Sequence, residues 1–301
     1  MLRRLEAVLL IFLTFGSVSV DARQVRPLPE TAKPSASDRI LIVAPHIDDE
    51  AIAAAGYVSA ARAAGAEVFI VYLTAGDCNH TSARMLGHTL SPKPAVFLQL
   101  GKQRYGEALE ATGRMKVPRS NVFLLGYPDG GLRAMLDDPD KVVRSRGTAR
   151  TEVPYAEAVK PGSAYRLENL VRDLDGVLKA TRPTVVLLPV TFDSHSDHSA
   201  TGEITQHVVA ASGMAPRLLG YLVHASRFPV PFRPAASRPL DPPLAFARKA
   251  WTVFPLTTEQ ELQKKRVLQA YRSQREDPYL YLLTGAFVRR NELFVDLSAR
   301  K

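Results

Sequence analysis

Two short polar clusters contain most of the side chains in this sequence that could carry out chemistry. They are residues 45–50, with the sequence PHIDDE, and residues 193–198, with the sequence DSHSDH. Each cluster directly follows a short, continuous run of apolar residues, which predicts a buried strand. Because ligands of open α/β sheets bind beyond the carboxyl ends of the strands, the two clusters could meet at one edge of a sheet.

The residue types in these clusters are those of a metal site. His46 and Asp49, together with His198, would form a site of two histidines and one carboxylate. This donor set leaves a coordination position open, as a catalytic zinc site requires. Since the chain has a single cysteine, Cys78, a cysteine-rich zinc site is excluded, and any metal must be held by His, Asp or Glu.

The remaining polar side chains of the clusters have the types that hydrolysis needs. Asp48 would stay free beside the metal as a base, and His195 with Asp197 would supply an acid for the leaving group. Structural alternatives stay open for each cluster alone, because a histidine at a strand end can be a simple hydrogen-bonding group and an Asp-Asp-Glu run can cap a helix. Two such clusters, each after a strand, favour the catalytic interpretation.

The elements that would position these residues alternate along the chain. Apolar runs predict strands at residues 39–45, 67–74, 121–126, 184–190 and 217–224. Helical spacing predicts helices at residues 50–64, 95–112, 166–180, 198–211 and 257–273. Strands that are apolar throughout and alternate with helices are typical of a parallel sheet covered on both faces. We therefore predict one α/β domain over residues 39–301, a Rossmann-like three-layer sandwich with a mostly parallel sheet.

The N-terminus predicts export. Residues 1–22 combine the basic Arg3 and Arg4, an uncharged and mostly apolar stretch over residues 7–20, and the small residue Ala22 before a cleavage site, which is the pattern of a secretory signal peptide. The stretch is shorter than the roughly 20 residues that span a bilayer. We expect a periplasmic or extracellular protein, with an uncleaved anchor as the alternative. Residues 23–38, rich in Pro, Ser and Ala, predict a linker.

The net charge and the absence of a dinucleotide-binding motif limit the classes of partner that the sequence predicts. The 301 residues carry a formal net charge of +9. An exported protein meets little nucleic acid, so peripheral contact with an anionic membrane or glycan surface fits this charge better. A solvated basic surface without a specific partner is an equal alternative. The turn after the first strand is acidic and lacks the Gly-x-Gly-x-x-Gly pattern, which disfavours dinucleotide binding.

Outside the clusters, a few residues and segments have open roles. His224 ends a predicted strand and could reach the site, although core packing is the simpler expectation. Tyr127 could belong to the core or form a platform for a sugar ring, and Trp251 is expected in the core. The long segments 134–161 and 228–243 are expected to rim the cleft and to set substrate choice.

The two clusters resemble the metal motifs of the LmbE/PIG-L-type zinc N-deacetylases. Residues 45–50 are similar to the family's Pro-His-Pro-Asp-Asp-Glu motif, and residues 195–198 to its His-Pro-Asp-His motif. Weaker resemblances follow in the family's order at residues 74–77, 104–107, 126–130 and 271–274, so that the match extends from about Arg39 to Phe294. Ile47 and Ser196 replace the motif prolines at positions that supply no ligand, so we expect altered loop stiffness and not loss of the metal.

The resemblance implies a metal site and a base. A zinc ion would be held by His46, Asp49 and His198, and Asp48 would be the general base for the water that zinc activates. These are the same residues that the spacing of the clusters brought together.

The resemblance also implies the other site residues and the reaction. His195 would donate a proton or stabilise the oxyanion, Asp197 would orient the His195 ring, and Arg104 and Asp129 would act on the substrate side. The implied function is removal of an N-acetyl group from an N-acetylglucosamine-type amino sugar in a glycan, glycolipid or glycoconjugate. Two alternatives stay open: a zinc amidase that cleaves another amide of a sugar conjugate, and a non-catalytic sugar-binding α/β domain. The oligomeric state is not predicted.

Overall fold

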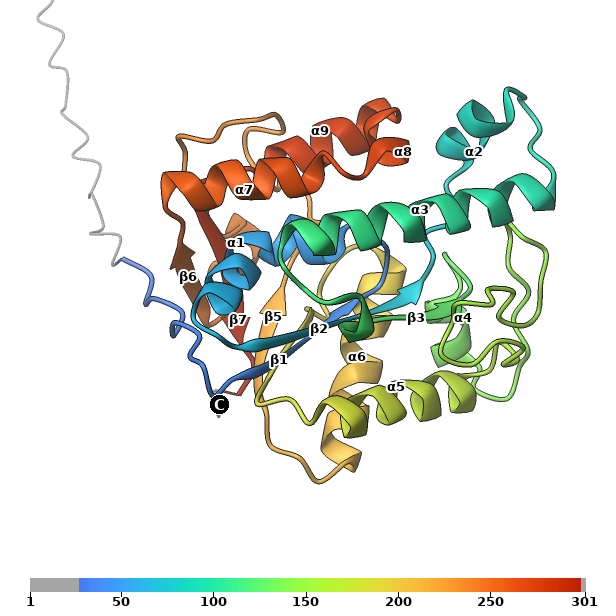
Figure 1. The fold of residues 1–301 in the computed structure, drawn as a ribbon, viewed down its shortest axis with the longest axis horizontal. Coiled ribbons are helices and arrows are strands. Elements are labelled where there is room, and N and C mark those ends of the chain that lie inside the picture. The colour runs from blue at the N-terminus through green and yellow to red at the C-terminus, as the bar shows by residue number, and fades with distance from the viewer. Residues whose placement is uncertain (1–26, 299–301) are drawn as a thin grey trace, which may run out of the picture.

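A seven-stranded sheet forms the centre of the protein (Figure 1), for which a computed structural model describes residues 27–298. The strands lie in the order β3-β2-β1-β4-β5-β7-β6. Neighbouring strands from β3 to β5 are parallel, whereas β7 is antiparallel to both β5 and β6. Their bounds are β1 Arg39–Ala44, β2 Glu67–Thr74, β3 Val122–Tyr127, β4 Val185–Pro189, β5 Arg217–Tyr221, β6 Trp251–Pro255 and β7 Asn291–Asp296. The predicted mostly parallel sheet is confirmed.

Helices cover both faces of the sheet, which confirms the three-layer sandwich. Helices α5 and α6 pack against one face, and α1 and α3 against the other, with α7 packed on α1 and α3 (Figure 1). The helix bounds are α1 Asp49–Ala63, α2 His80–Gly87, α3 Pro94–Arg114, α4 Leu132–Asp137, α5 Leu167–Thr181, α6 Ser196–Ala211, α7 Thr258–Leu268, α8 Arg272–Arg275 and α9 Pro278–Ala286. Two short 3-10 helices, η1 Arg119–Asn121 and η2 Leu244–Phe246, complete the described elements.

The elements form where hydrophobic burial requires them. Strands β1 and β2 are buried along almost their whole length, which explains why their apolar runs do not alternate with polar residues. Helix α1 is rich in alanine and is buried on nearly every side between the sheet and α7. Helix α5 instead buries one stripe, represented by Leu170, Leu174 and Val177, and exposes the opposite face.

The structure adds elements that the sequence pattern did not predict. Strands β6 and β7 extend the sheet beyond β5, and Trp251 of β6 is buried, as expected for a core residue. The helix expected over residues 257–273 is two helices, because α7 ends at Leu268 and the chain turns at Tyr271 before α8. That turn places Tyr271 and Ser273 inside the protein, where both bond to buried carboxylates. Tyr127 lies in the core, and its hydroxyl donates to Asp173 (2.8 Å).

The N-terminal expectations have different outcomes. The expected signal peptide, residues 1–22, lies outside the described residues. The expected linker, residues 23–38, differs from a free connection in its described part, because Thr31 N–H donates to Val253 O (2.8 Å) and Val253 N–H donates to Pro29 O (2.9 Å). Glu30 thereby pairs alongside β6, which attaches this segment to the edge of the sheet. Among the described helices, none combines the length and apolarity needed to cross a membrane.

Candidate metal centre and active site

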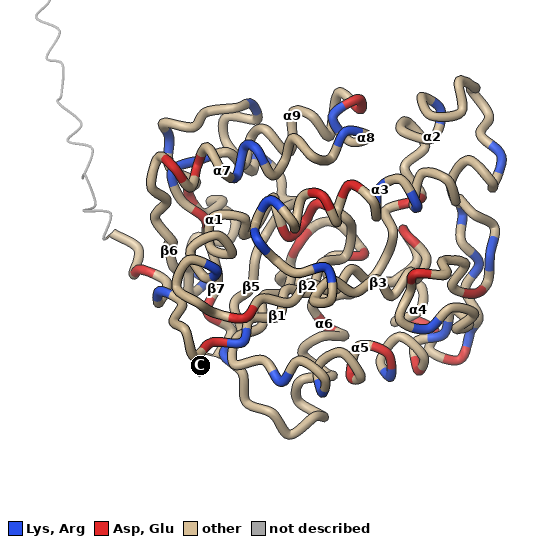
Figure 2. Tube along the Cα trace, in the orientation of Figure 1, with Lys and Arg blue, Asp and Glu red and all other residues tan. Residues whose placement is uncertain are grey.

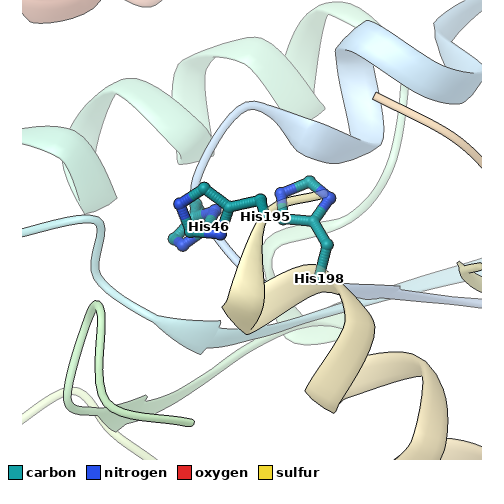
Figure 3. A group of neighbouring side chains, drawn as sticks. All are labelled: His46, His195 and His198. Carbon is teal, nitrogen blue, oxygen red and sulfur yellow. The ribbon is translucent and has the colours of Figure 1, made fainter. Parts of the chain in front are cut away.

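The two polar clusters meet at the carboxyl edge of the parallel strands, as predicted. The loops after β1, β2, β3, β4 and β5 all contribute residues to this edge, and they line a cavity of about 280 Å³. Strands β1 and β4 are adjacent, and their chains continue to opposite sides of the sheet, so the cavity lies at the topological switch point where open α/β sheets bind ligands. Figure 3 shows His46, after β1, facing His195 and His198 at the start of α6.

A close approach of α6 to β4 brings His198 to this edge. His198 lies in the first turn of α6, and Gly202 one turn later lies against the end of β4. A Cβ atom at Gly202 would be 2.5 Å from the carbonyl oxygen of Pro189, so a larger residue would push the helix away. Gly202 therefore helps to set the distance between His198 and residues 45–50, which follow β1.

His46, Asp49 and His198 have the geometry of a metal site. Asp49 Oδ2 lies 3.3 Å from His46 Nδ1 and 3.3 Å from His198 Nε2. Two donors on one zinc ion at tetrahedral angles are separated by about 3.3 Å when the bonds are 2.0–2.1 Å long. His198 is completely buried, and neither of its ring nitrogens makes a hydrogen bond to another described residue. A buried imidazole whose Nε2 faces the carboxylate of Asp49 without a hydrogen bond to it fits a metal ligand.

Other donors surround this set. Ring nitrogens of His46, His195 and His198 lie within 4.8 Å of one another. A ring nitrogen of His46 and carboxylate oxygens of Asp129 and Asp197 form a second group with the same spacing. The cluster of imidazoles and carboxylates could therefore hold a metal ion. The two ring nitrogens of His46 face different carboxylates. Nδ1 faces Asp49, whereas Nε2 faces Asp129 and Asp197 at 3.4 and 3.3 Å.

Asp193, to which the sequence analysis gave no role, supports the buried histidine. Its Oδ2 lies 3.2 Å from His198 Nδ1 and accepts the N–H groups of Val223 and His224 at 3.0 Å each, and its Oδ1 accepts the N–H of His195 (2.9 Å). A histidine that binds a metal through one nitrogen usually meets a carboxylate at the other. The signal was present in the sequence, because Asp193 opens the DSHSDH cluster.

The electrostatics of the site favour a cation. Burial lowers the pKa of His198, but Asp49 and Asp193 outweigh this effect and raise the pKa to about 9. Burial alone would also raise the pKa of Asp49, yet His198 and His46 hold it well below its ordinary value. Asp49 therefore stays ionised between two imidazoles, and its negative charge favours a metal cation at this position.

Asp48 is placed as a free carboxylate beside the metal set. It occupies the N-cap position of α1, but its side chain does not cap the helix, so the capping alternative fails for this residue. Its φ of 127° lies in the region that favours glycine, and such strain is common at functional sites. Burial and then repulsion by Asp49 raise the pKa of Asp48 well above its ordinary value, although Arg104 and His46 oppose the shift. A carboxylate with this pKa direction is suited to accept a proton.

The expected pairing of Asp197 with the His195 ring differs from the structure. The Asp197 carboxylate accepts the N–H groups of Gly130 (2.7 Å) and Leu132 (3.1 Å) and the Nε2–H of His46 (3.3 Å). His195 is the N-cap residue of α6, and the backbone N–H of Asp197 donates to its Nδ1 (3.2 Å). The two side chains diverge because the helix starts between them. Asp197 therefore orients His46, and it holds His195 through its backbone alone.

Arg104 and Asp129 lie where substrate residues were expected. Both line the cavity. Arg104 is buried, and it donates from Nη1 to the carbonyl of Gly76 (2.5 Å) and from Nη2 to Ser82 Oγ (3.1 Å). Asp129 accepts the N–H of Cys78 (2.6 Å), and although burial raises its pKa, His46 lowers it to about 2. An ionised carboxylate and a guanidinium thus face the same cavity.

His224 belongs to the site, so core packing was the wrong choice between its two expected roles. Its ring lies 4.7 Å from that of His198 and 5.2 Å from that of His195, and it lines the cavity. Four residues of the 228–243 segment, Phe228, Pro229, Val230 and Phe232, line a cavity that adjoins the site, and its role in substrate choice stays a prediction. None of the described residues of the 134–161 segment lines the site cavity.

The short helix α8 and the residue before it contact the segment 45–50 that contains Asp48. Gln274 is buried and donates from Nε2 to the carbonyl of Ile47, and the Tyr271 hydroxyl donates to Glu50. Ser273 bonds to Glu107 of α3 through its hydroxyl (2.7 Å) and its N–H (3.0 Å). Residues 271–274, a weak resemblance in the sequence, thus fix the peptide that precedes Asp48.

Basic residues are distributed along many elements of the fold. Figure 2 shows Lys and Arg on many elements, and not gathered on a single one. This distribution agrees with a solvated basic surface better than with a dedicated polyanion site.

Curated relatives share the sequence over a common region. The chain is 32% identical over 198 residues to a 1D-myo-inositol 2-acetamido-2-deoxy-alpha-D-glucopyranoside deacetylase of Nakamurella multipartita, covering 61% of this chain and 59% of that protein. It is 22% identical over 179 residues to a diacetylchitobiose deacetylase of Thermococcus kodakarensis, covering 58% of this chain and 51% of that protein. The chain thus spans little more than half the length of these curated relatives.

The fold and a family model agree with this relationship. A conserved protein of Thermus thermophilus has the same fold, with a TM-score of 0.53 and 21% identity, covering 86% of this chain and 94% of that one. The family model described as "PIG-L: GlcNAc-PI de-N-acetylase" matches residues 41–209, which include both clusters and more than half of the chain. The chain therefore belongs to the PIG-L family.

Proposed function

We propose that this protein is a zinc-dependent hydrolase that removes the N-acetyl group from an N-acetylglucosamine-type amino sugar. The observation that carries the proposal is the position of Asp49 Oδ2, which lies 3.3 Å from one nitrogen of each of His46 and His198. The carboxylate of Asp48, which makes no helix-capping bond, is adjacent in the chain. The names of the two curated relatives, which are deacetylases of N-acetylated sugar compounds, support the substrate class.

The metal would occupy the space between His46, Asp49 and His198. A zinc ion held there would supply a Lewis acid that polarises the amide carbonyl and lowers the pKa of water to about 7. Zinc is our choice because two imidazoles and one carboxylate with an open position are the donor set of catalytic zinc sites.

Asp48 would carry the proton through the reaction. It accepts a proton from the attacking water as oxygen adds to the amide carbon, and a tetrahedral oxyanion forms. When the C–N bond breaks, the same proton passes to the departing nitrogen, so that a free amine and acetic acid are released, and the acid loses its proton to solvent as acetate. The raised pKa of Asp48 suits both steps, because the group must hold the proton between them.

His195 would stabilise the oxyanion. Its Nδ1 accepts the N–H of Asp197, so the proton of the neutral ring lies on Nε2 and can be donated to a developing negative charge. Burial, followed by repulsion from His46 and His198, lowers the pKa of His195 to about 4, which keeps the ring neutral near pH 7. This favours Asp48 over His195 as the proton carrier, a choice that the sequence left open.

The experiment measures acetate release from a panel of N-acetylglucosamine compounds, together with zinc content. The parent protein is expected to release acetate. His198→Ala is expected to lose bound zinc, because it removes a ligand, whereas His195→Ala is expected to keep zinc and lose turnover. Equal zinc content in the two variants would refute the ligand assignment, and no acetate release by the zinc-loaded parent would refute the function.

We also propose that the protein acts outside the cytoplasm. The support is the secretory pattern of residues 1–22, with Arg3, Arg4 and Ala22. After expression of the full chain in bacteria, N-terminal sequencing of the protein in the periplasm is expected to begin at Arg23. Recovery of the intact N-terminus in the cytoplasm would contradict export.

A further inference from the structure

A second and larger cavity opens directly beside the active site. It has a volume of about 770 Å³, against about 280 Å³ for the site cavity. Val223, His224, Tyr279 and Leu283 line both. Because these four residues form a common wall, a molecule bound at the metal set can extend into the second cavity without a break in contact.

The second cavity has a mostly apolar lining. The segment after β5 contributes Phe228, Val230 and Phe232, and α9 contributes Tyr279 and Leu283. Val230 is 68% exposed, Tyr279 56% and Phe232 40%, and the rings of Phe232 and Tyr279 lie 5.8 Å apart. Among the described residues of this lining, Arg227 is the one with a charge. Large apolar side chains that stay exposed together typically mark a binding surface.

The two cavities therefore present one polar end and one apolar end. His46 and Asp49 of the metal set line the site cavity together with Asp48 and Asp129, and an amide and sugar hydroxyls would find partners there. Polar side chains such as Ser194, Ser226 and Arg227 are present in the second cavity, but apolar residues make up most of its lining. A further sugar packed against Phe228, Val230 and Phe232 would lose water without gaining polar contacts to them.

We propose that the second cavity is a subsite for an apolar group, an alkyl chain or an aromatic ring, carried by the amino-sugar substrate. This inference rests on the proposed function of the adjoining site. The apolar group could be the aglycone of the sugar or a longer acyl chain on its nitrogen. Continuity with the catalytic cavity assigns the surface to the substrate and not to a membrane, which would have no need of the shared wall.

The test measures binding along two series of compounds. One series contains the methyl, butyl and hexyl glycosides of N-acetylglucosamine, and the other contains glucosamine N-acylated with acetyl, butanoyl and hexanoyl groups. Calorimetry on the zinc-loaded Asp48→Asn variant gives a Kd for each compound without turnover. We expect the Kd to fall about threefold to fourfold for each methylene buried in one of the two series. The series that shows this dependence identifies the source of the apolar group.

Two further substitutions, each made in the Asp48→Asn background, locate the effect. Phe232→Ser is expected to flatten the dependence on chain length, because it removes an aromatic wall of the subsite. Leu90→Ser is the matched control, because Leu90 is an apolar residue that is 87% exposed and does not line the cavity. The control is expected to keep the full dependence.

The outcomes separate the inference from the proposed function. Kd values that do not change with chain length in either series would overturn the subsite, even if the parent deacetylates the methyl glycoside. A chain-length dependence that requires Phe232 would support the subsite, even if the parent releases no acetate, and the proposed function would then fail alone. Cosedimentation of the parent with phosphatidylglycerol vesicles, lost in Phe232→Ser and combined with flat series, would show a membrane contact and overturn the inference.

Discussion

A substitution at Asp193 tests whether zinc binding depends on the carboxylate that contacts the Nδ1 atom of His198. The substitution Asp193→Asn removes the negative charge 3.2 Å from His198 Nδ1. The new amide oxygen can still face the N–H groups of Val223 and His224, which leaves the N–H of His195 opposite an NH2 group. One unpaired buried amide costs about 1–3 kcal/mol of unfolding free energy. Loss of a carboxylate behind a metal-bound histidine typically weakens metal binding about tenfold to hundredfold.

The assay compares zinc affinity with stability. Competition with a chromogenic chelator gives the zinc Kd, and urea unfolding of the metal-free protein gives the stability. Asp173→Asn is the matched control, because Asp173 is also buried and accepts a hydrogen bond from Tyr127, away from the site. We expect both variants to lose stability and Asp193→Asn alone to lose zinc affinity. An unchanged zinc Kd in a folded Asp193→Asn variant would refute the reasoning.

Two further predictions concern the peptide that precedes Asp48 and the buried carboxyl group of Asp77. Gln274→Leu removes the donor to the Ile47 carbonyl beside Asp48, and a misplaced base is expected to lower kcat about tenfold to hundredfold with little change in KM. Gln263→Leu, which removes another side-chain contact to a backbone carbonyl far from the site, should leave kcat unchanged; equal losses in steady-state kinetics would argue against positioning. Burial and then repulsion by a neighbouring carboxylate raise the pKa of Asp77 to about 7. The unfolded chain releases this proton near pH 4, so stability should fall by up to about 4 kcal/mol between pH 4 and 7. Asp77→Asn should flatten that loss in urea unfolding at pH 5 and 7, and parallel curves for the two proteins would contradict the assignment.

The sheet and the meeting of the two clusters could be predicted because they depend on short-range patterns. Continuous apolar runs identified β1 and β4, and the rule that parallel strands share a carboxyl edge placed residues 45–50 beside residues 193–198. Strands β6 and β7 were not predicted, because they depart from the parallel alternation of strands and helices and pair with each other in the antiparallel direction across a segment of several helices.

The finer arrangement of the site depends on where helices begin and on which loops meet. Asp197 faces His46 because α6 begins at Ser196, and a shift of this boundary by one residue would turn the side chain elsewhere. His224 reaches the site because β5 lies beside β4 in the sheet, which no local pattern in the sequence states. The link from Gln274 to Ile47 spans 227 residues of the chain, so only the folded structure reveals it.

Acetate release by the parent protein and by Asp48→Asn, measured at equal zinc loading on an N-acetylglucosamine compound, tests the central claim most directly. We expect the variant to keep its zinc, because Asp48 is not a ligand. Its turnover is expected to fall about a hundredfold to ten-thousandfold, which is the usual contribution of a general base. Turnover by Asp48→Asn close to that of the parent would contradict the assignment of Asp48 as the proton carrier.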